Sequence, residues 1–113
     1  QPPARRDGLR SLVPAAAKAG AKYTGGSDAR HGLFWLELKY LVDMGISPMD
    51  AIRAGTAWAA EASAVGDKVG TLEAGKFADV ISVPGDPLAD INVMEHVNII
   101  IKGGVRVDGL SSY

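Results

Sequence analysis

The 113-residue sequence predicts an α/β chain made of two parts that differ in their hydrophobic pattern. Residues 9 to about 64 carry helical apolar spacing around one short strand-like segment. From about residue 66 the period changes, and glycines and prolines separate short β-branched runs typical of strands. A helix–strand–helix unit packs against neighbouring strands, so the first part looks like one turn of an α/β winding.

The first helix and the strand-like segment precede the most polar stretch of this part. Gly20 is predicted to end the first helix, in which Pro14 lies either in the first turn or at a kink. The segment Ala21 to Thr24 then reads as a short strand that runs into two glycines. The apolar face of the first helix comprises Leu9, Leu12, Val13, Ala16 and Ala17.

Three further helices are predicted from apolar spacing and cap residues. One covers residues 33–44 and stops at Gly45. The next opens at Ser47-Pro48, because serine is a typical N-cap and proline suits the first helical position. Thr56 is predicted to cap a short helix through residues 57–62.

The second part predicts a small antiparallel β piece. Residues 80–83 read as a strand, residues 84–87 as a turn, and residues 97–101 as a second strand. Gly103-Gly104 supplies the positive φ values that a tight hairpin into residues 105–107 requires.

Composition and charge exclude several classes of protein. Hydrophobic residues make up 47% of the chain, charged residues 22%, and the formal net charge is −1, as in a globular chain rather than a disordered one. The charges are mixed, so no basic face indicates nucleic acid and no cationic helix indicates a membrane surface. Because there is no cysteine, disulfide scaffolds and thiolate metal sites are excluded. The absence of cysteine does not determine the cellular compartment, for which the cytoplasm is slightly favoured.

Asp28 is the candidate site residue. It lies in the stretch Tyr23-Thr24-Gly25-Gly26-Ser27-Asp28-Ala29-Arg30-His31-Gly32. Short polar residues at the end of an apolar run usually form a turn, in which an aspartate caps the next helix. A carboxylate in such a place can instead take part in chemistry. These residues alone favour the turn.

Five motifs change that balance, because they resemble the metal-dependent amidohydrolase superfamily in order and spacing. Gly26-Ser27-Asp28-Ala29 resembles the G-S/T-D-A motif that ends the last barrel strand, and residues 47–60 resemble the helices that follow it. Residues 69–80, with Gly75-Lys76 and Ala78-Asp79, are similar to the superfamily's "G.l..GK.ADlvv" hallmark. Residues 84–91 are similar to its "dPl.di" turn, and residues 97–107 to its closing hairpin. The resemblance covers nearly the whole chain and is strongest to imidazolonepropionase-like and Xaa-Pro or Xaa-Arg dipeptidase-like members.

The resemblance implies a parent fold and a division of this chain. The parent is a (β/α)8 barrel with a composite β-sandwich. Residues 1–65 would form the C-terminal end of the barrel, with its last βα unit and following helices. Residues 66–113 would form the C-terminal part of the sandwich domain.

The resemblance also implies a catalytic role for Asp28, as ligand of a divalent metal and as proton shuttle. Barrel active sites gather at the C-terminal ends of the strands. A metal, with zinc the favoured ion, lowers the pKa of its bound water, and a nearby carboxylate can take the proton and hand it to the departing nitrogen. Gly25 and Gly26 would let the backbone approach the metal without a Cβ in the way. The implied reaction is hydrolysis of an amide, peptide or cyclic amide C–N bond.

Most ligands that the resemblance implies are missing from this chain. Superfamily members carry a His-x-His, a carboxylated lysine or a glutamate, and two later histidines, whereas this chain has only His31 and His96. One carboxylate cannot hold zinc, which takes three or four protein ligands. We therefore expect a C-terminal segment that needs the remainder of the barrel, in cis or in trans. Its expected partners are a small-molecule or short-peptide substrate and further copies in a homo-oligomer, with no nucleic acid and no membrane.

The remaining polar and aromatic candidates are assigned simpler roles. His31 could contact substrate or orient Asp28, although an ordinary loop histidine is favoured. His96 is predicted to be structural or exposed, and Trp35 and Trp58 lie at helical apolar positions that indicate packing.

The hallmark residues Glu73, Lys76 and Asp79 are predicted to be structural rather than catalytic. Two alternatives to a hydrolase segment stay open: a non-catalytic α+β interaction module, and one chain of a split amidohydrolase. Exposed apolar surface near Tyr23 would discriminate between them, because an independent domain would cover it.

Overall fold

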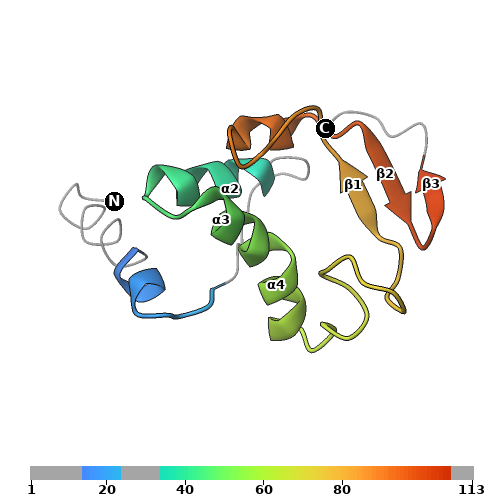
Figure 1. The fold of residues 1–113 in the computed structure, drawn as a ribbon, viewed down its shortest axis with the longest axis horizontal. Helices are drawn as coiled ribbons and strands as arrows, with labels where there is room; N and C mark the ends of the chain where they lie inside the picture. The colour runs from blue at the N-terminus through green and yellow to red at the C-terminus, as the bar shows by residue number, and fades with distance from the viewer. Residues whose placement is uncertain (1–13, 24–33, 108–113) are drawn as a thin grey trace.

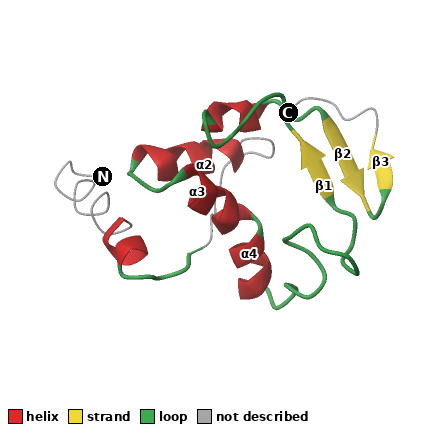
Figure 2. Cartoon of the chain, viewed as in Figure 1, coloured by secondary structure: helices red, strands yellow, loops and turns green. Residues whose placement is uncertain are grey.

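The computed structural model describes residues 14–23 and 34–107. Its helices gather on one side and a small sheet stands on the other (Figure 1). Long loops join these two groups of elements (Figure 2). After a helical turn at residues 14–18 the elements are α2 (Phe34–Asp43), α3 (Pro48–Gly55), α4 (Ala57–Ala62), β1 (Val80–Ser82), the 3-10 helix η1 (Ile91–Glu95), β2 (Ile99–Lys102) and β3 (Val105–Val107).

Local cap chemistry sets the helix boundaries as the sequence predicts. Gly20 and Gly45 adopt φ values of +89° and +99°, the left-handed conformation that ends a helix at little cost for glycine. At the start of α3, the Ser47 Oγ accepts a hydrogen bond from the backbone N–H of Asp50 at 3.2 Å, and Pro48 occupies the first turn. The predicted stops and the predicted N-cap are confirmed.

The hydrophobic core lies where α2, α3 and η1 meet. The small side chains Ala51 and Ala54 of α3 are fully buried and let α2 approach closely. Ile91 of η1 also joins this core, so the chain returns to the helices between β1 and β2. The buried core cluster comprises Leu38, Leu41, Ile46, Ala51, Ala54 and Ile91.

The three strands form an antiparallel sheet in the order β1-β2-β3. Val80 lies opposite Ile101, and Ile100 lies opposite Val107. Gly103 and Gly104 join β2 to β3 with φ values of +57° and +81°, as a two-residue hairpin of this hand requires. The predicted hairpin is confirmed.

The loop between α4 and β1 lies against α4 at Gly70. Gly70 has a φ of +104°, and a Cβ built on it would lie 2.7 Å from the Ala60 Cβ and 3.2 Å from the Ala57 Cα. Only glycine fits so close an approach at such a φ value. The backbone N–H of Phe77 donates to the Lys68 carbonyl oxygen at 2.9 Å and closes the loop.

Several sequence-based boundaries are corrected. Residues 21–23 form no strand, because a barrel strand needs hydrogen-bonded neighbours and the described residues supply none beside it; Thr24 lies outside the described residues. The strand predicted at residues 97–101 begins at Ile99 and the one at residues 80–83 ends at Ser82. The 3-10 helix η1 was not predicted, and within the described residues no helix is long and apolar enough to cross a membrane.

Thr56 does not cap α4 through its side chain, contrary to the prediction. Its Oγ1 donates instead to the carbonyl oxygen of Ile52 at 2.7 Å, a back-bond of the kind that bends helices. The backbone of Thr56 leaves the helical region, with φ −129° and ψ −93°. The helices α3 and α4 therefore follow each other directly with a bend at Thr56.

Candidate functional site

Both predicted site residues, Asp28 and His31, lie outside the described residues. Their roles therefore stay predictions. The structure does describe the residues that flank this segment, Tyr23 on its N-terminal side and Phe34 on its C-terminal side, and it shows what holds them.

The N-terminal flank is held on α4 by two consecutive side chains. The rings of Tyr23 and Trp58 meet edge to face, with centroids 5.3 Å apart and an interplanar angle of 75°, a preferred geometry for aromatic pairs. The Lys22 Nζ donates to both carboxylate oxygens of Glu61, at 3.1 and 3.3 Å. Lys22 and Glu61 are both more than half exposed, so the aromatic contact contributes more than the ion pair.

The hydroxyl of Tyr23 is buried and has no hydrogen-bond partner among the described residues. Burial raises the pKa of this phenol, and the nearby Asp50 carboxylate raises it further. The hydroxyl therefore keeps its proton at neutral pH and can act as a donor. Buried polar groups are nearly always hydrogen-bonded in folded proteins. Among the described residues this hydroxyl, five positions before Asp28 in the sequence, is an exception.

The C-terminal flank rests on a glycine of α3. A Cβ built on Gly55 would lie 3.0 Å from the Cε1 of Phe34 and 3.4 Å from the Cδ2 of Leu38. Because Gly55 has no side chain, the Phe34 ring can pack directly on the backbone of α3. Gly55 stands three residues before Trp58, so the two flanks meet the same bend between α3 and α4.

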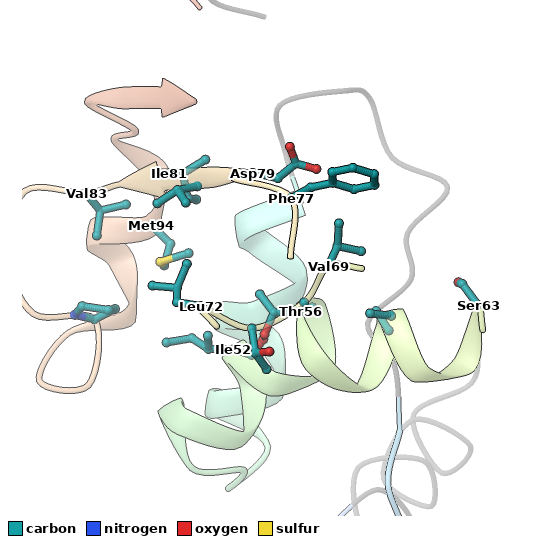
Figure 3. A pocket seen from close by; sticks show the side chains of 17 residues that line it. Ile52, Thr56, Ser63, Val69, Leu72, Phe77, Asp79, Ile81, Val83 and Met94 are labelled. Atoms are coloured by element: carbon teal, nitrogen blue, oxygen red, sulfur yellow. The ribbon is translucent and has the colours of Figure 1, made fainter. Parts of the chain in front are cut away.

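A mainly apolar cavity of about 680 Å³ lies between the α3–α4 pair and the start of the sheet (Figure 3). Ile52 of α3, Ile81 of β1 and Met94 of η1 are among the residues that line it. Leu72 and Phe77 also line it, and they are 80% and 63% exposed. The sequence did not predict this cavity, because its walls come from elements far apart in the chain.

Among the described residues that line the cavity, Asp79 is the one with a charge, and its carboxylate is engaged by the hairpin. Its Oδ1 accepts from the backbone N–H of Gly103 at 2.8 Å, and its Oδ2 accepts from the Lys102 Nζ at 2.9 Å. The Gly103 hydrogen bond, and then the one from Lys102, lower the pKa of Asp79. Asp79 therefore ties the start of β1 to the β2–β3 turn.

Lys76 fastens the loop between α4 and β1. Its Nζ donates to the carbonyl oxygen of Gly66 at 2.7 Å and to the Thr71 Oγ1 at 2.6 Å, and lies 3.7 Å from the Glu73 Oε2. The side chain is only 14% exposed. The contacts of Glu73, Lys76 and Asp79 lie within the chain's own fold, which agrees with the structural role predicted for them.

The other sequence candidates also occupy ordinary positions. The His96 side chain is 68% exposed, with its Nε2 3.7 Å from the Glu95 Oε2, which agrees with the prediction of an exposed or structural histidine. Trp58 packs against the hydrophobic core, as predicted, and Trp35 is half-buried on α2.

No metal centre can be built from the described residues. Within residues 14–23 and 34–107, no three His, Asp or Glu side chains come together in a way that could hold a metal ion. This part of the chain does not fit a complete metal site, and a zinc ion needs three or four protein ligands.

Comparison with known proteins decides the family. A model of the amidohydrolase family matches residues 4–107. The chain belongs to the amidohydrolase family. This confirms the resemblance derived from the five motifs. A search of curated proteins finds no significant match.

Solved structures of amidohydrolases and related hydrolases share this fold. A Xaa-Pro dipeptidase with methionine in its active site is 38% identical with a TM-score of 0.83. The matched part is 89% of this chain and 26% of the dipeptidase chain. A putative prolidase from Bifidobacterium longum is 33% identical with a TM-score of 0.82, with coverage of 89% and 26%. The ochratoxinase of A. niger is 37% identical with a TM-score of 0.76, with coverage of 87% and 24%. This amidohydrolase chain thus spans about a quarter of each of these structures.

Sequence reasoning missed the residues that flank the site segment of this amidohydrolase chain. The sequence predicts Tyr23 as part of a strand and assigns no contact to Gly55. One signal was present, since Gly55 and Trp58 stand three residues apart, the spacing of neighbours on one helix face. It did not indicate that Tyr23 and Phe34 would contact them.

Proposed function

We propose that this chain is the C-terminal segment of a metal-dependent amidohydrolase that hydrolyses an amide, peptide or cyclic amide C–N bond. The observation that carries the proposal is the family match over residues 4–107, combined with coverage of only about a quarter of the solved relatives. In this proposal residues 1–65 complete a (β/α)8 barrel, and residues 66–113 complete a β-sandwich.

Exposed apolar side chains support a segment rather than a free-standing interaction module. Leu72, Phe77 and Val105 are 80%, 63% and 68% exposed, and Leu72 and Phe77 line the cavity. No strand among the described residues pairs with residues 21–23, although Tyr23 itself packs against the core. An independent domain rarely leaves so much apolar surface open. We propose that the remainder of the barrel and sandwich covers it, in cis or in the other chain of a split enzyme.

In the proposed reaction, Asp28 is both a metal ligand and the group that moves the proton. The other ligands of the divalent ion, for which zinc is favoured, come from outside the described residues; the bound ion would supply an acidified water and a polarised carbonyl. The Asp28 carboxylate accepts the proton of the attacking water and returns it to the departing nitrogen, because an amine leaves poorly as an anion. His31 is the proposed substrate contact.

The substrate is proposed to be a short peptide or a small amide. Two of the structural relatives are described as a Xaa-Pro dipeptidase and a putative prolidase, and both align over 89% of this chain. A homo-oligomer is proposed as the working assembly.

Metal analysis and a dipeptide assay test this function together. A protein that contains the upstream barrel should hydrolyse Xaa-Pro dipeptides or related amides, lose activity on chelation and regain it with zinc. The 113-residue chain alone should hold no stoichiometric zinc, because it can offer only Asp28 and His31. One or two tightly held ions in the chain alone, or activity untouched by chelation, would contradict the proposal.

A further inference from the structure

We infer that an extended segment from the upstream part of the proposed enzyme pairs with the free edge of β1 and fills the cavity between β1 and the α3–α4 pair. The inference rests on the proposed function, because this segment belongs to polypeptide that precedes the 113 residues in the longer enzyme. The docking site itself, β1 with the cavity beside it, lies wholly within the described residues.

β1 is an edge strand whose open side borders the cavity. The sheet order β1-β2-β3 places β2 on one side of β1, and no described strand lies on the other side, which faces the helices (Figure 1). Val80 and Ile81 of β1 both line the cavity, although consecutive side chains of a strand point to opposite faces of the sheet. The cavity therefore reaches around the edge of β1, where a further strand would run about 4.8 Å away.

The sheet carries apolar side chains on both of its faces. The register places Ile81, Ile100 and Val107 on one face, and Val80 and Ile101 on the other. Strands that are apolar on both faces are typical of sheets buried on both sides. Ile81 is nevertheless 48% exposed. The strand sequences thus suit more burial than the described residues supply.

The walls of the cavity suit apolar side chains. Leu72, Phe77 and Met94 border the same space (Figure 3), and the Asp79 carboxylate is already held by the hairpin. An extended segment with β-branched or aromatic side chains would cover Leu72 and Phe77, while its backbone would pair with the unpaired N–H and C=O groups of an edge strand. A small apolar molecule could fill the volume, but it would leave this edge unpaired.

The size of the solved relatives favours upstream polypeptide as the source of the segment. The Xaa-Pro dipeptidase and the putative prolidase match 89% of this chain with TM-scores of 0.83 and 0.82, so their helices and sheet are arranged much as they are here. The matched part is 26% of each relative. The same arrangement therefore occurs beside a much longer stretch of polypeptide.

Phe77→p-benzoylphenylalanine, in the longer protein that contains the upstream barrel, tests the docking directly. Phe77 lines the cavity and is 63% exposed in this chain. Irradiation should link position 77 to one upstream segment, which mass spectrometry of the digested protein identifies. A link to a second copy of the protein, or no link to any upstream residue, would overturn the inference.

Hydrogen exchange along β1 measures the pairing of its free edge. In the 113-residue chain, alternate N–H groups of Val80–Ser82 should exchange fast, because an edge strand has partners on one side only. In the longer protein these fast amides should exchange at least about tenfold more slowly. Equal exchange of these amides in the two proteins would contradict the proposed pairing.

Leu72→Asp puts a charge where the segment would lie. It should leave the melting temperature of the 113-residue chain unchanged, because Leu72 is 80% exposed there, and lower that of the longer protein by at least about 2 °C. Leu88→Asp is the matched control, since Leu88 is 46% exposed and is not among the described residues that line the cavity. Equal shifts for the two variants in the longer protein would count against the docking site.

Dipeptide hydrolysis, assayed on the same longer protein, separates this inference from the proposed function. Hydrolysis without a link from position 77 to an upstream segment would overturn the docking inference and leave the function standing. A link to an upstream segment in a protein that hydrolyses no dipeptide or related amide would support the docking and contradict the function.

Discussion

Gly70→Ala should destabilise the protein far more than Gly75→Ala, although both glycines belong to one loop and adopt similar φ values of +104° and +93°. A side chain at such a φ value costs about 1–2 kcal/mol in either place. At Gly75 nothing lies within 4 Å of the new Cβ, so the cost should stop there. At Gly70 the Cβ would lie 2.7 Å from the Ala60 Cβ and 3.2 Å from the Ala57 Cα, and overpacking of this kind costs about 1–3 kcal/mol more.

Urea unfolding followed by tryptophan fluorescence measures the difference, because Trp58 lies on α4, the helix that Gly70 contacts. The expected loss in free energy of unfolding is about 2–5 kcal/mol for Gly70→Ala and about 1–2 kcal/mol for Gly75→Ala. Equal losses in the two variants would refute the conclusion that the loop lies against α4 at Gly70.

Two further perturbations probe the hallmark segment. Lys76→Met should cost about 1–3 kcal/mol in free energy of unfolding, because it leaves the part-buried Gly66 carbonyl oxygen without its donor at 2.7 Å; a loss below half a kcal/mol in a thermal or urea melt would argue against the fastening role. Acid should destabilise the protein through Asp79. The pKa of Asp79 is lowered in the folded state, so the unfolded chain binds this proton more readily. The contribution of Asp79 to the free energy of unfolding is therefore complete above about pH 4 and is lost as the pH falls further. Asp79→Asn should flatten this part of the stability–pH curve, and an unchanged slope would contradict the role of the Gly103 and Lys102 hydrogen bonds.

Local chemistry explains the parts of the fold that could be predicted from sequence. The stops at Gly20 and Gly45, the Ser47 cap and the Gly103-Gly104 hairpin each depend on residues a few positions apart. The predicted strand at residues 21–24 failed at residues 21–23 because strand pairing depends on distant partners. Thr56 does not cap α4 because its hydroxyl donates instead to the carbonyl oxygen of Ile52 in the preceding helix α3.

The site could be predicted only in part for the same physical reason. Asp28 stands out through the order of the motifs along the chain, and the family match over residues 4–107 confirms the resemblance on which that rests. The role of Asp28 itself stays a prediction. The contacts of Tyr23 with Trp58 and of Phe34 with Gly55 join residues more than twenty positions apart. No local pattern encodes such pairs.

The pH–rate profile of Asp28→Asn, in the protein that contains the whole barrel and holds its metal, tests the proposed function most directly. Asparagine keeps the size of the side chain and one oxygen ligand but removes the proton acceptor. If Asp28 moves the proton, kcat should fall about 10²-fold or more, KM should change much less, and the acidic limb of the profile should shift or vanish. His31→Gln should cost little by comparison. Near wild-type kcat in Asp28→Asn, with metal content unchanged and the acidic limb in place, would contradict the account and leave Asp28 as a turn residue.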